Sequence, residues 1–233
     1  MLNRANRTLA TRRGSRRRRH FESLENRELL TFIAQISGTD NVYTPDNATH
    51  VADSEGNTYV GGRFMGTADF DPGPDTFELS SEWDTAFVAK YGPEGELLWA
   101  RGFDIEGRSK GPNSPLAMTR GLAVDGNGAV YATGRFNYSI DLTGNGDYIA
   151  TPGKEENAFV VKLDSTTGST VWANTIGVEG SASGNEIAVG VDGVVYVGGT
   201  YSGTVDFDPG SGTHDLTSAG LIVVFISMLI AAG

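Results

Sequence analysis

The stretch DSEGNTYVGGRFMGTADFDPG, residues 53–73, is one of three similar stretches in this chain of 233 residues. The second is DGNGAVYATGRFNYSIDLTGN, residues 125–145, and the third is GVDGVVYVGGTYSGTVDFDPG, residues 190–210. All three carry a tyrosine, a glycine, an aromatic residue and an aspartate at matching positions. The acidic pentamer DFDPG therefore recurs because a whole unit recurs, which indicates a repeat architecture.

Each unit continues beyond this stretch into further strand-like sequence. DTAFVAKY (84–91), ENAFVVKL (156–163) and IVVFISML (222–229) follow in the three copies, and in the first two a glycine turn leads on to a tryptophan. The first copy thus offers four candidate strands, NTYVGGRF, GTADFD, AFVAKY and ELLWAR. Their apolar residues alternate with polar ones or run together, as in strands. Glu22–Ile36 is the one stretch with a helical pattern.

Composition and charge narrow the function classes. The 32 glycines and 39% hydrophobic residues suit short strands joined by turns, and the absence of cysteine excludes disulfides, thiolate metal sites and cysteine nucleophiles. Residues 1–30 hold nine arginines and three glutamates, a net charge of +6, whereas the rest of the chain carries −17. An acidic body repels nucleic acid, so we expect no nucleic-acid partner and interpret the arginines as a targeting segment or solvated tail.

Four strands per unit, with glycines where strands crowd together, are typical of beta-propeller blades. A solenoid is the main alternative, but solenoid repeats are usually shorter than about 45 residues. We predict an all-β fold, a partial beta-propeller of about three four-stranded blades with a disordered basic N-terminal arm. The predicted boundaries are a leader arm at 1–45 and an incomplete propeller domain at 46–233, with units at about 50–121, 122–186 and 187–233. DIEGRSKGPNSPLAMT, residues 104–119, is interpreted as a surface insertion.

The pattern A-V-D-x-x-G-x-x-Y-x-x-G-x-F, followed by D-x-F-V-x-K and x-G-x-x-x-W-A, resembles the bacterial SBBP beta-propeller repeat over about residues 50–233. The hairpin KLDSTTGSTVWA (162–173) is similar to the blade turn of pyrroloquinoline-quinone-type propellers, a turn that many blades share and that identifies no cofactor. The third copy departs from the pattern, because Gly190, Ile222 and Met228 replace two aspartates and a lysine.

The two ends of the chain bear on localisation. FESLENRELL, residues 21–30, resembles the LEPR-x-L-L N-terminal motif of large bacterial surface proteins, with Asn26 in place of its proline. This resemblance implies export, although no apolar signal-peptide core follows. The C-terminal LIVVFISMLIAAG, residues 221–233, is too short for a spanning helix, so no transmembrane helix is expected. Its alignment with DTAFVAKY predicts the inner strand of the third unit instead.

Aspartates after the repeated strands are candidate calcium ligands. Two carboxylates on one strand face beside a turn could supply part of the oxygen shell of a hard cation. Aspartate and glycine also simply end strands, and a catalytic carboxylate pair is a third interpretation. The candidate metal ligands are Asp69, Asp71, Asp141, Asp147, Asp206 and Asp208.

Other side chains give weaker signals. The three histidines, His20, His50 and His214, share no repeat position, so a zinc site is not expected. Trp99 and Trp172 could stack on sugars, but their equivalent placement favours packing. The repeated Lys90 and Lys162 suit a strand edge, and the repeated Arg63 and Arg135 could attract anions or form salt bridges.

These observations predict a non-catalytic, exported or cell-surface repeat scaffold, in which no catalytic residue and no required cofactor is identified and calcium is optional. The alternatives are a carbohydrate-active propeller enzyme, which needs carboxylates and aromatic residues gathered at one mouth, and a calcium- or quinone-dependent sensor. Expected partners are a protein or polysaccharide at the cell surface. A closed propeller needs about four to eight blades, so we also expect either a truncated family member or self-association through an open blade edge at residues 221–233.

Overall fold

The computed structural model describes residues 36–38, 42–43, 49–107, 114–150, 155–177, 180–208, 212–220 and 222–229. Every described residue belongs to one compact unit, residues 32–233. The described residues form strands, turns and loops without any helix, and every sheet is antiparallel, so the all-β prediction is confirmed. Within this described part no helix is available to cross a membrane. The predicted helix Glu22–Ile36 lies outside the described residues, apart from Ile36.

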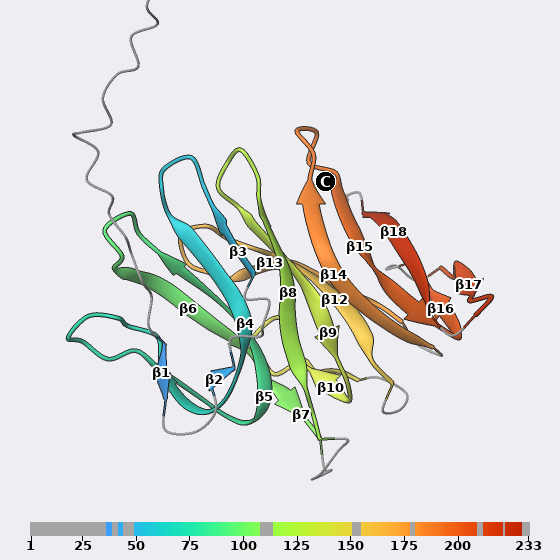
Figure 1. The fold of residues 1–233 in the computed structure, drawn as a ribbon, viewed down its shortest axis with the longest axis horizontal. Coiled ribbons are helices and arrows are strands. Elements are labelled where there is room, and N and C mark those ends of the chain that lie inside the picture. Colours follow the sequence, from blue (N-terminus) through green and yellow to red (C-terminus); the bar gives the residue numbers. More distant parts are fainter. Residues whose placement is uncertain are drawn as a thin grey trace, which may run out of the picture. The chain divides into compact units, whose positions relative to one another are not determined.

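Three sheets account for most of the described chain (Figure 1). In the first, the long strand β4 is flanked on one side by β5 and then β6, and on the other by three short strands in line. The bounds are β1 Ser37–Gly38, β2 Val42–Tyr43, β3 Thr49–Ala52, β4 Thr58–Asp69, β5 Glu78–Tyr91 and β6 Leu97–Phe103.

The second sheet has the order β13-β12-β9-β8 and the third the order β14-β15-β18. Their bounds are β8 Ala117–Val124, β9 Val130–Phe136, β12 Asn157–Leu163, β13 Thr170–Ile176, β14 Ser181–Val189, β15 Val195–Ser202 and β18 Val223–Leu229. Two small sheets complete the fold, with bounds β7 Ile105–Glu106, β10 Ser139–Ile140, β11 Ile149–Ala150, β16 Thr204–Asp206 and β17 Asp215–Thr217.

The repeated segments occupy equivalent places in the three sheets. The aligned glycine of each copy is the cross-strand partner of the aligned phenylalanine: Gly62 of Phe87, Gly134 of Phe159 and Gly199 of Phe225. The glycine is required by this packing, since a Cβ on Gly134 would lie 1.9 Å from the Met118 carbonyl oxygen and 2.8 Å from the Phe159 ring. The sequence repeat is therefore a structural repeat of one sheet.

Two details of the predicted strand assignment are wrong. GTADFD forms no separate strand in the first sheet, because its first four residues are the end of β4, which stops at Asp69. The first strand of the second and third sheets instead precedes the repeated stretch: β8 spans the predicted unit boundary at 121/122, and β14 spans the one at 186/187. The end of the predicted insertion, LAMT, also belongs largely to β8. β8 and β14 share only their last residues, LAV and IAV, and differ before them, so comparison of the copies indicated the ends of these strands but not where they begin.

The sheet domain also begins before the predicted boundary at residue 46. Strands β1 and β2 come from the segment assigned to the basic arm, and both pair with β4. Each contains only two residues, too few for a period-two pattern to be visible in the sequence. The rest of the predicted arm, with its arginines and the FESLENRELL motif, lies outside the described residues.

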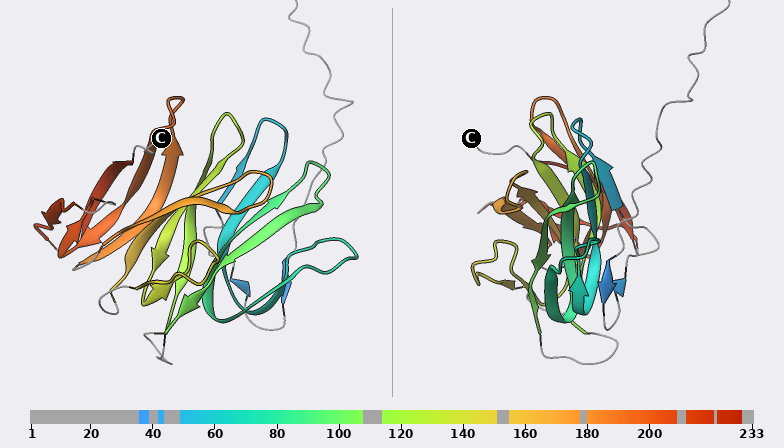
Figure 2. Two further views of the ribbon diagram at one scale, coloured as in Figure 1. Left: turned by 180° about the vertical axis from the view of Figure 1, so that it is seen from behind. Right: turned by 90° about the vertical axis from the view of Figure 1, so that its left-hand side faces the viewer.

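The three sheets pack face to face in chain order (Figure 2). Ala86 and Val88 of β5 join Phe159 and Val161 of β12 in one core. The alternate residues of β12, including Val160, join β15 and β18 in a second core. The second sheet is thus buried on both faces, which explains why NAFVVKL is almost continuously apolar.

The phenylalanine of DFDPG packs in the core: Phe70 is fully buried, and Phe207 is partly buried against the second core. The Phe70 ring lies 5.5 Å from Phe64 and 5.0 Å from Phe87, with steep edge-to-face angles. In the third copy Phe207 lies 5.2 Å from Tyr201 and 4.9 Å from Phe225. The middle copy has Leu142, fully buried, at the same position. The pentamer therefore places one large apolar side chain under each outer sheet.

Candidate functional site

The aspartates of the two DFDPG pentamers hold their own loops. Asp69 Oδ1 accepts hydrogen bonds from the backbone N–H groups of Asp71 and Phe77, both at 3.0 Å. Asp206 Oδ1 accepts the equivalent bonds from Asp208 and His214, at 2.9 and 2.8 Å. Asp and Asn side chains commonly stabilise turns in this way. Each aspartate therefore fixes the hairpin that carries the phenylalanine of its own pentamer.

Of the predicted ligands, Asp141 in the middle copy has the carboxylate that accepts the most hydrogen bonds among the described residues. It is only 4% exposed, and it accepts backbone N–H bonds from Thr143, Gly144 and Gly146 at 2.7–2.8 Å. Burial acts to raise the pKa of Asp141, but these hydrogen bonds outweigh burial and hold the pKa below its usual value. The nearby Asp147 accepts a bond from the Asn145 side chain instead.

The six predicted calcium ligands lie in three different loops, one for each copy. Within the described ranges no group of three or more His, Asp or Glu side chains is arranged to hold a metal ion. His50 lies on β3 and His214 in the third-copy loop, whereas His20 is outside the described residues. Calcium binding by these loops remains a prediction.

The opposite end of the first two sheets carries a repeated polar cluster. In the first copy Lys90 lies over the Tyr59 ring at 5.2 Å and donates to the Ser165 carbonyl oxygen at 2.9 Å. Trp99, only 7% exposed, packs beside Tyr59 with ring centroids 6.1 Å apart. Burial, followed by the Asp53 carboxylate, raises the pKa of Tyr59, so its hydroxyl remains a donor. The rings of this cluster therefore pack against each other, and its polar atoms hydrogen-bond to turn residues.

The second copy repeats this cluster with Tyr131, Lys162 and Trp172 at closely similar distances. The third copy has Gly190 and Met228 at the positions of the aspartate and the lysine. In the first copy the cluster joins the first sheet to the second through the bonds to Ser165, and the third copy lacks two of the cluster's members.

The two repeated arginines form ion pairs with the repeated acidic residues. Arg63 lies 3.4 Å from Asp84, and Arg135 pairs with Glu156. The third copy has Thr200 and Ile222 at these two positions, so both charges are replaced together. This arrangement fits the salt-bridge interpretation of the arginines.

These replacements change the chemistry of one sheet face. We call the side chains of Ile222, Val224, Ile226 and Met228 the outer face of β18. They are 72%, 75%, 79% and 57% exposed. On β5 and β12 the equivalent face has an acidic residue at one end, a lysine at the other and small apolar residues between, and the next sheet covers those apolar residues.

A cleft of about 810 Å³ lies between the first half of β5 and the small sheet β7-β10-β11. It is lined by Ser80, Ser81, Glu82, Trp83, Asp104, Ile105, Glu106, Gly107, Tyr138, Ser139 and Tyr148. Sequence reasoning identified none of these residues, because they come from two units and meet only when the sheets pack.

Comparison with known proteins adds no assignment. No protein-family model matches this chain, and no curated protein matches it.

Proposed function

We propose that this chain is a non-catalytic interaction scaffold, exported or at the cell surface, in which each main sheet is a propeller-type blade. The order of strands, the repeat of one sheet per unit and the face-to-face packing support the blade interpretation. Export rests on the FESLENRELL resemblance alone.

The observation that carries the proposal is the outer face of β18. Large apolar side chains exposed together on a sheet face mark an interaction site. The same strand is the edge of the third sheet, and the charges that protect the equivalent faces are replaced by Ile222 and Met228. The occupant we propose is a second copy of this chain, with the two faces in symmetric contact.

The free energy of such a contact is sufficient for weak association. Fully burying one side chain of this kind contributes about 1.5–3 kcal/mol, and the four are each more than half exposed. Two copies therefore gain on the order of 10 kcal/mol, against an association cost of about 4–15 kcal/mol. At the lower end of that cost the net gain is about 6 kcal/mol, so a dimer that forms at tens of micromolar or above is expected.

Sedimentation velocity of the full chain over a range of concentrations tests this proposal. The variant Ile222→Asp with Met228→Lys restores the charges of the other copies and should shift the protein to monomer. Val191→Lys is the matched control, because Val191 is a fully exposed apolar residue in the turn between β14 and β15 and does not belong to this face. A wild-type protein that is monomeric at all concentrations, or a double variant that associates unchanged, would contradict the proposal.

A carbohydrate-active enzyme is a second candidate, and one observation favours it. Glu82, Asp104 and Glu106 share the cleft with three aromatic residues, as such an enzyme requires. Turnover of a polysaccharide that is lost in Asp104→Asn or Glu106→Gln would support the enzyme and reject a non-catalytic scaffold.

A further inference from the structure

We propose that the cleft between β5 and β10 binds an oligosaccharide built of neutral or amino sugars. This goes beyond the scaffold function, because the outer face of β18 contributes none of the cleft residues. The proposal rests on the backbone of Tyr138, the chemistry of the walls and the charge of the cleft.

Tyr138 is held in a backbone conformation that suits glycine. Its φ of 63° makes it the one non-glycine residue with positive φ among the described residues. The equivalent positions in the first and third copies are Gly66, with φ 81°, and Gly203, with φ 75°. A tyrosine in this region is strained, and strained residues cluster at functional sites. The middle copy has thus replaced the favoured glycine by a large aromatic side chain that lines the cleft.

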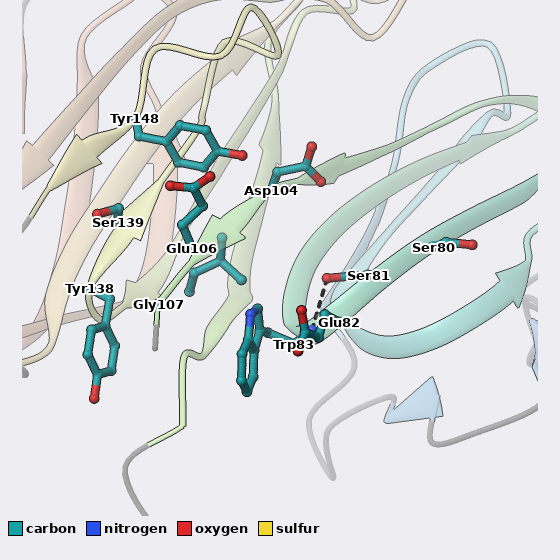
Figure 3. A pocket seen from close by; sticks show the side chains of 11 residues that line it. Ser80, Ser81, Glu82, Trp83, Asp104, Glu106, Gly107, Tyr138, Ser139 and Tyr148 are labelled. Carbon is teal, nitrogen blue, oxygen red and sulfur yellow. Dashed lines mark hydrogen bonds between the residues drawn. The ribbon is translucent and has the colours of Figure 1, made fainter. Parts of the chain in front are cut away.

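The walls of the cleft carry aromatic rings, carboxylates and serines, the groups that bind saccharides. Trp83 comes from β5, Tyr138 directly precedes β10, and Tyr148 directly precedes β11. All three residues line the cleft and are half-buried. Figure 3 shows Tyr148 and Trp83 apart from each other, with the Glu106 side chain between them in that view. Separate rings can each support the apolar C–H face of one sugar, while carboxylates and serines bond the hydroxyl groups.

Charge narrows the ligand class. Among the described residues that line the cleft, Glu82, Asp104 and Glu106 are acidic and none is a lysine or arginine. Burial and the charge of Asp141 raise the pKa of Asp104, and the nearby Arg101 opposes this rise. Uronates and sulfated sugars are therefore disfavoured, whereas amino sugars gain attraction. A quaternary ammonium ion alone would favour rings that converge into a cage, and here they are spread along the cleft.

Titration calorimetry with the full chain tests the proposal, using tetramers of glucosamine, N-acetylglucosamine, glucose (β-1,4-linked) and galacturonate, with choline as a separate probe. We expect the glucosamine tetramer to bind most tightly and tetragalacturonate not to bind. Tyr138→Gly should weaken binding at least tenfold and leave the melting temperature unchanged or raise it by about 2–4 °C, because backbone strain is released. Tyr138→Phe should retain most of the affinity.

Tyr196→Ala is the matched control, since Tyr196 is a 40% exposed tyrosine on β15, outside the cleft. It should bind as the wild type does. The proposal is overturned if no neutral or amino tetramer binds, if choline or tetragalacturonate binds as well as the glucosamine tetramer, or if Tyr138→Gly keeps full affinity. A Tyr138→Gly variant that loses binding together with several degrees of melting temperature would indicate a structural role and would also overturn it. Sedimentation of Tyr138→Gly should match the wild type, so the two proposals fail separately.

Discussion

Replacement of Phe70 by alanine should unfold the first sheet more easily than almost any other single change in the DFDPG loops. Phe70 is fully buried against Phe64 and Phe87. Buried Phe→Ala substitutions cost about 3–5 kcal/mol, through lost burial and the cavity that remains. The free energy of moving the ring out of water gives a similar value on its own, since burying about 150 Å² of apolar surface contributes on the order of 4 kcal/mol.

The chain supplies two matched comparisons for this substitution. Phe70→Leu should cost only about 1 kcal/mol, because Leu142 fills the equivalent position in the middle copy and is fully buried. Phe77→Ala should cost less than about 1 kcal/mol, because that ring is 40% exposed in the same loop. Urea denaturation followed by tryptophan fluorescence gives the three free energies of unfolding. If Phe70→Ala loses less than about 1 kcal/mol, or if leucine is as costly as alanine, the pentamer does not act through a core side chain.

Two further substitutions test the loops and the strand packing. Asp141→Asn should lower the free energy of unfolding at pH 6. Because the pKa of Asp141 in the folded protein is below the ordinary value of 3.8, the stability advantage of the wild type should be complete above about pH 4 and should shrink as the pH falls from there. An advantage that grows in acid would show that the ionised carboxylate does not stabilise the loop. Gly134→Ala should lower the free energy of unfolding by about 1–3 kcal/mol, measured by thermal or urea unfolding, because the new Cβ would overlap the Met118 carbonyl oxygen. Gly198→Ala is the control and should be nearly neutral, because its Cβ would meet nothing closer than 3.8 Å. Equal costs would show that the close approach at Gly134 is not the reason for the glycine.

The repeat itself was readable from the sequence. Tyrosine, glycine and phenylalanine recur because they meet the same neighbours in each sheet, and the all-β class followed from their patterns. The first strand of each sheet was readable only at its end, since AMTRGLAV and SASGNEIAV share their last residues, LAV and IAV, but not the residues before them, and THVA matches neither. Those strands are defined by pairing across the sheet, which a comparison of copies does not reveal.

Comparison of the three copies could not predict the cleft, for a different reason. Trp83 and Tyr148 have no aromatic counterpart in the other copies, and they come together only through the packing of two sheets. One signal was nevertheless present in the sequence, because Tyr138 aligns with Gly66 and Gly203. A large residue at a position where the other copies have glycine indicates a departure from the structural optimum.

Hydrogen–deuterium exchange at low and high protein concentration tests the interaction scaffold most directly. Residues 223–229 form the edge strand β18, which pairs only with β15 among the described strands. The proposed contact predicts that amide protection in this strand rises with concentration, while protection in β9 and β12 stays constant. Exchange of residues 223–229 that is independent of concentration would contradict association through this face.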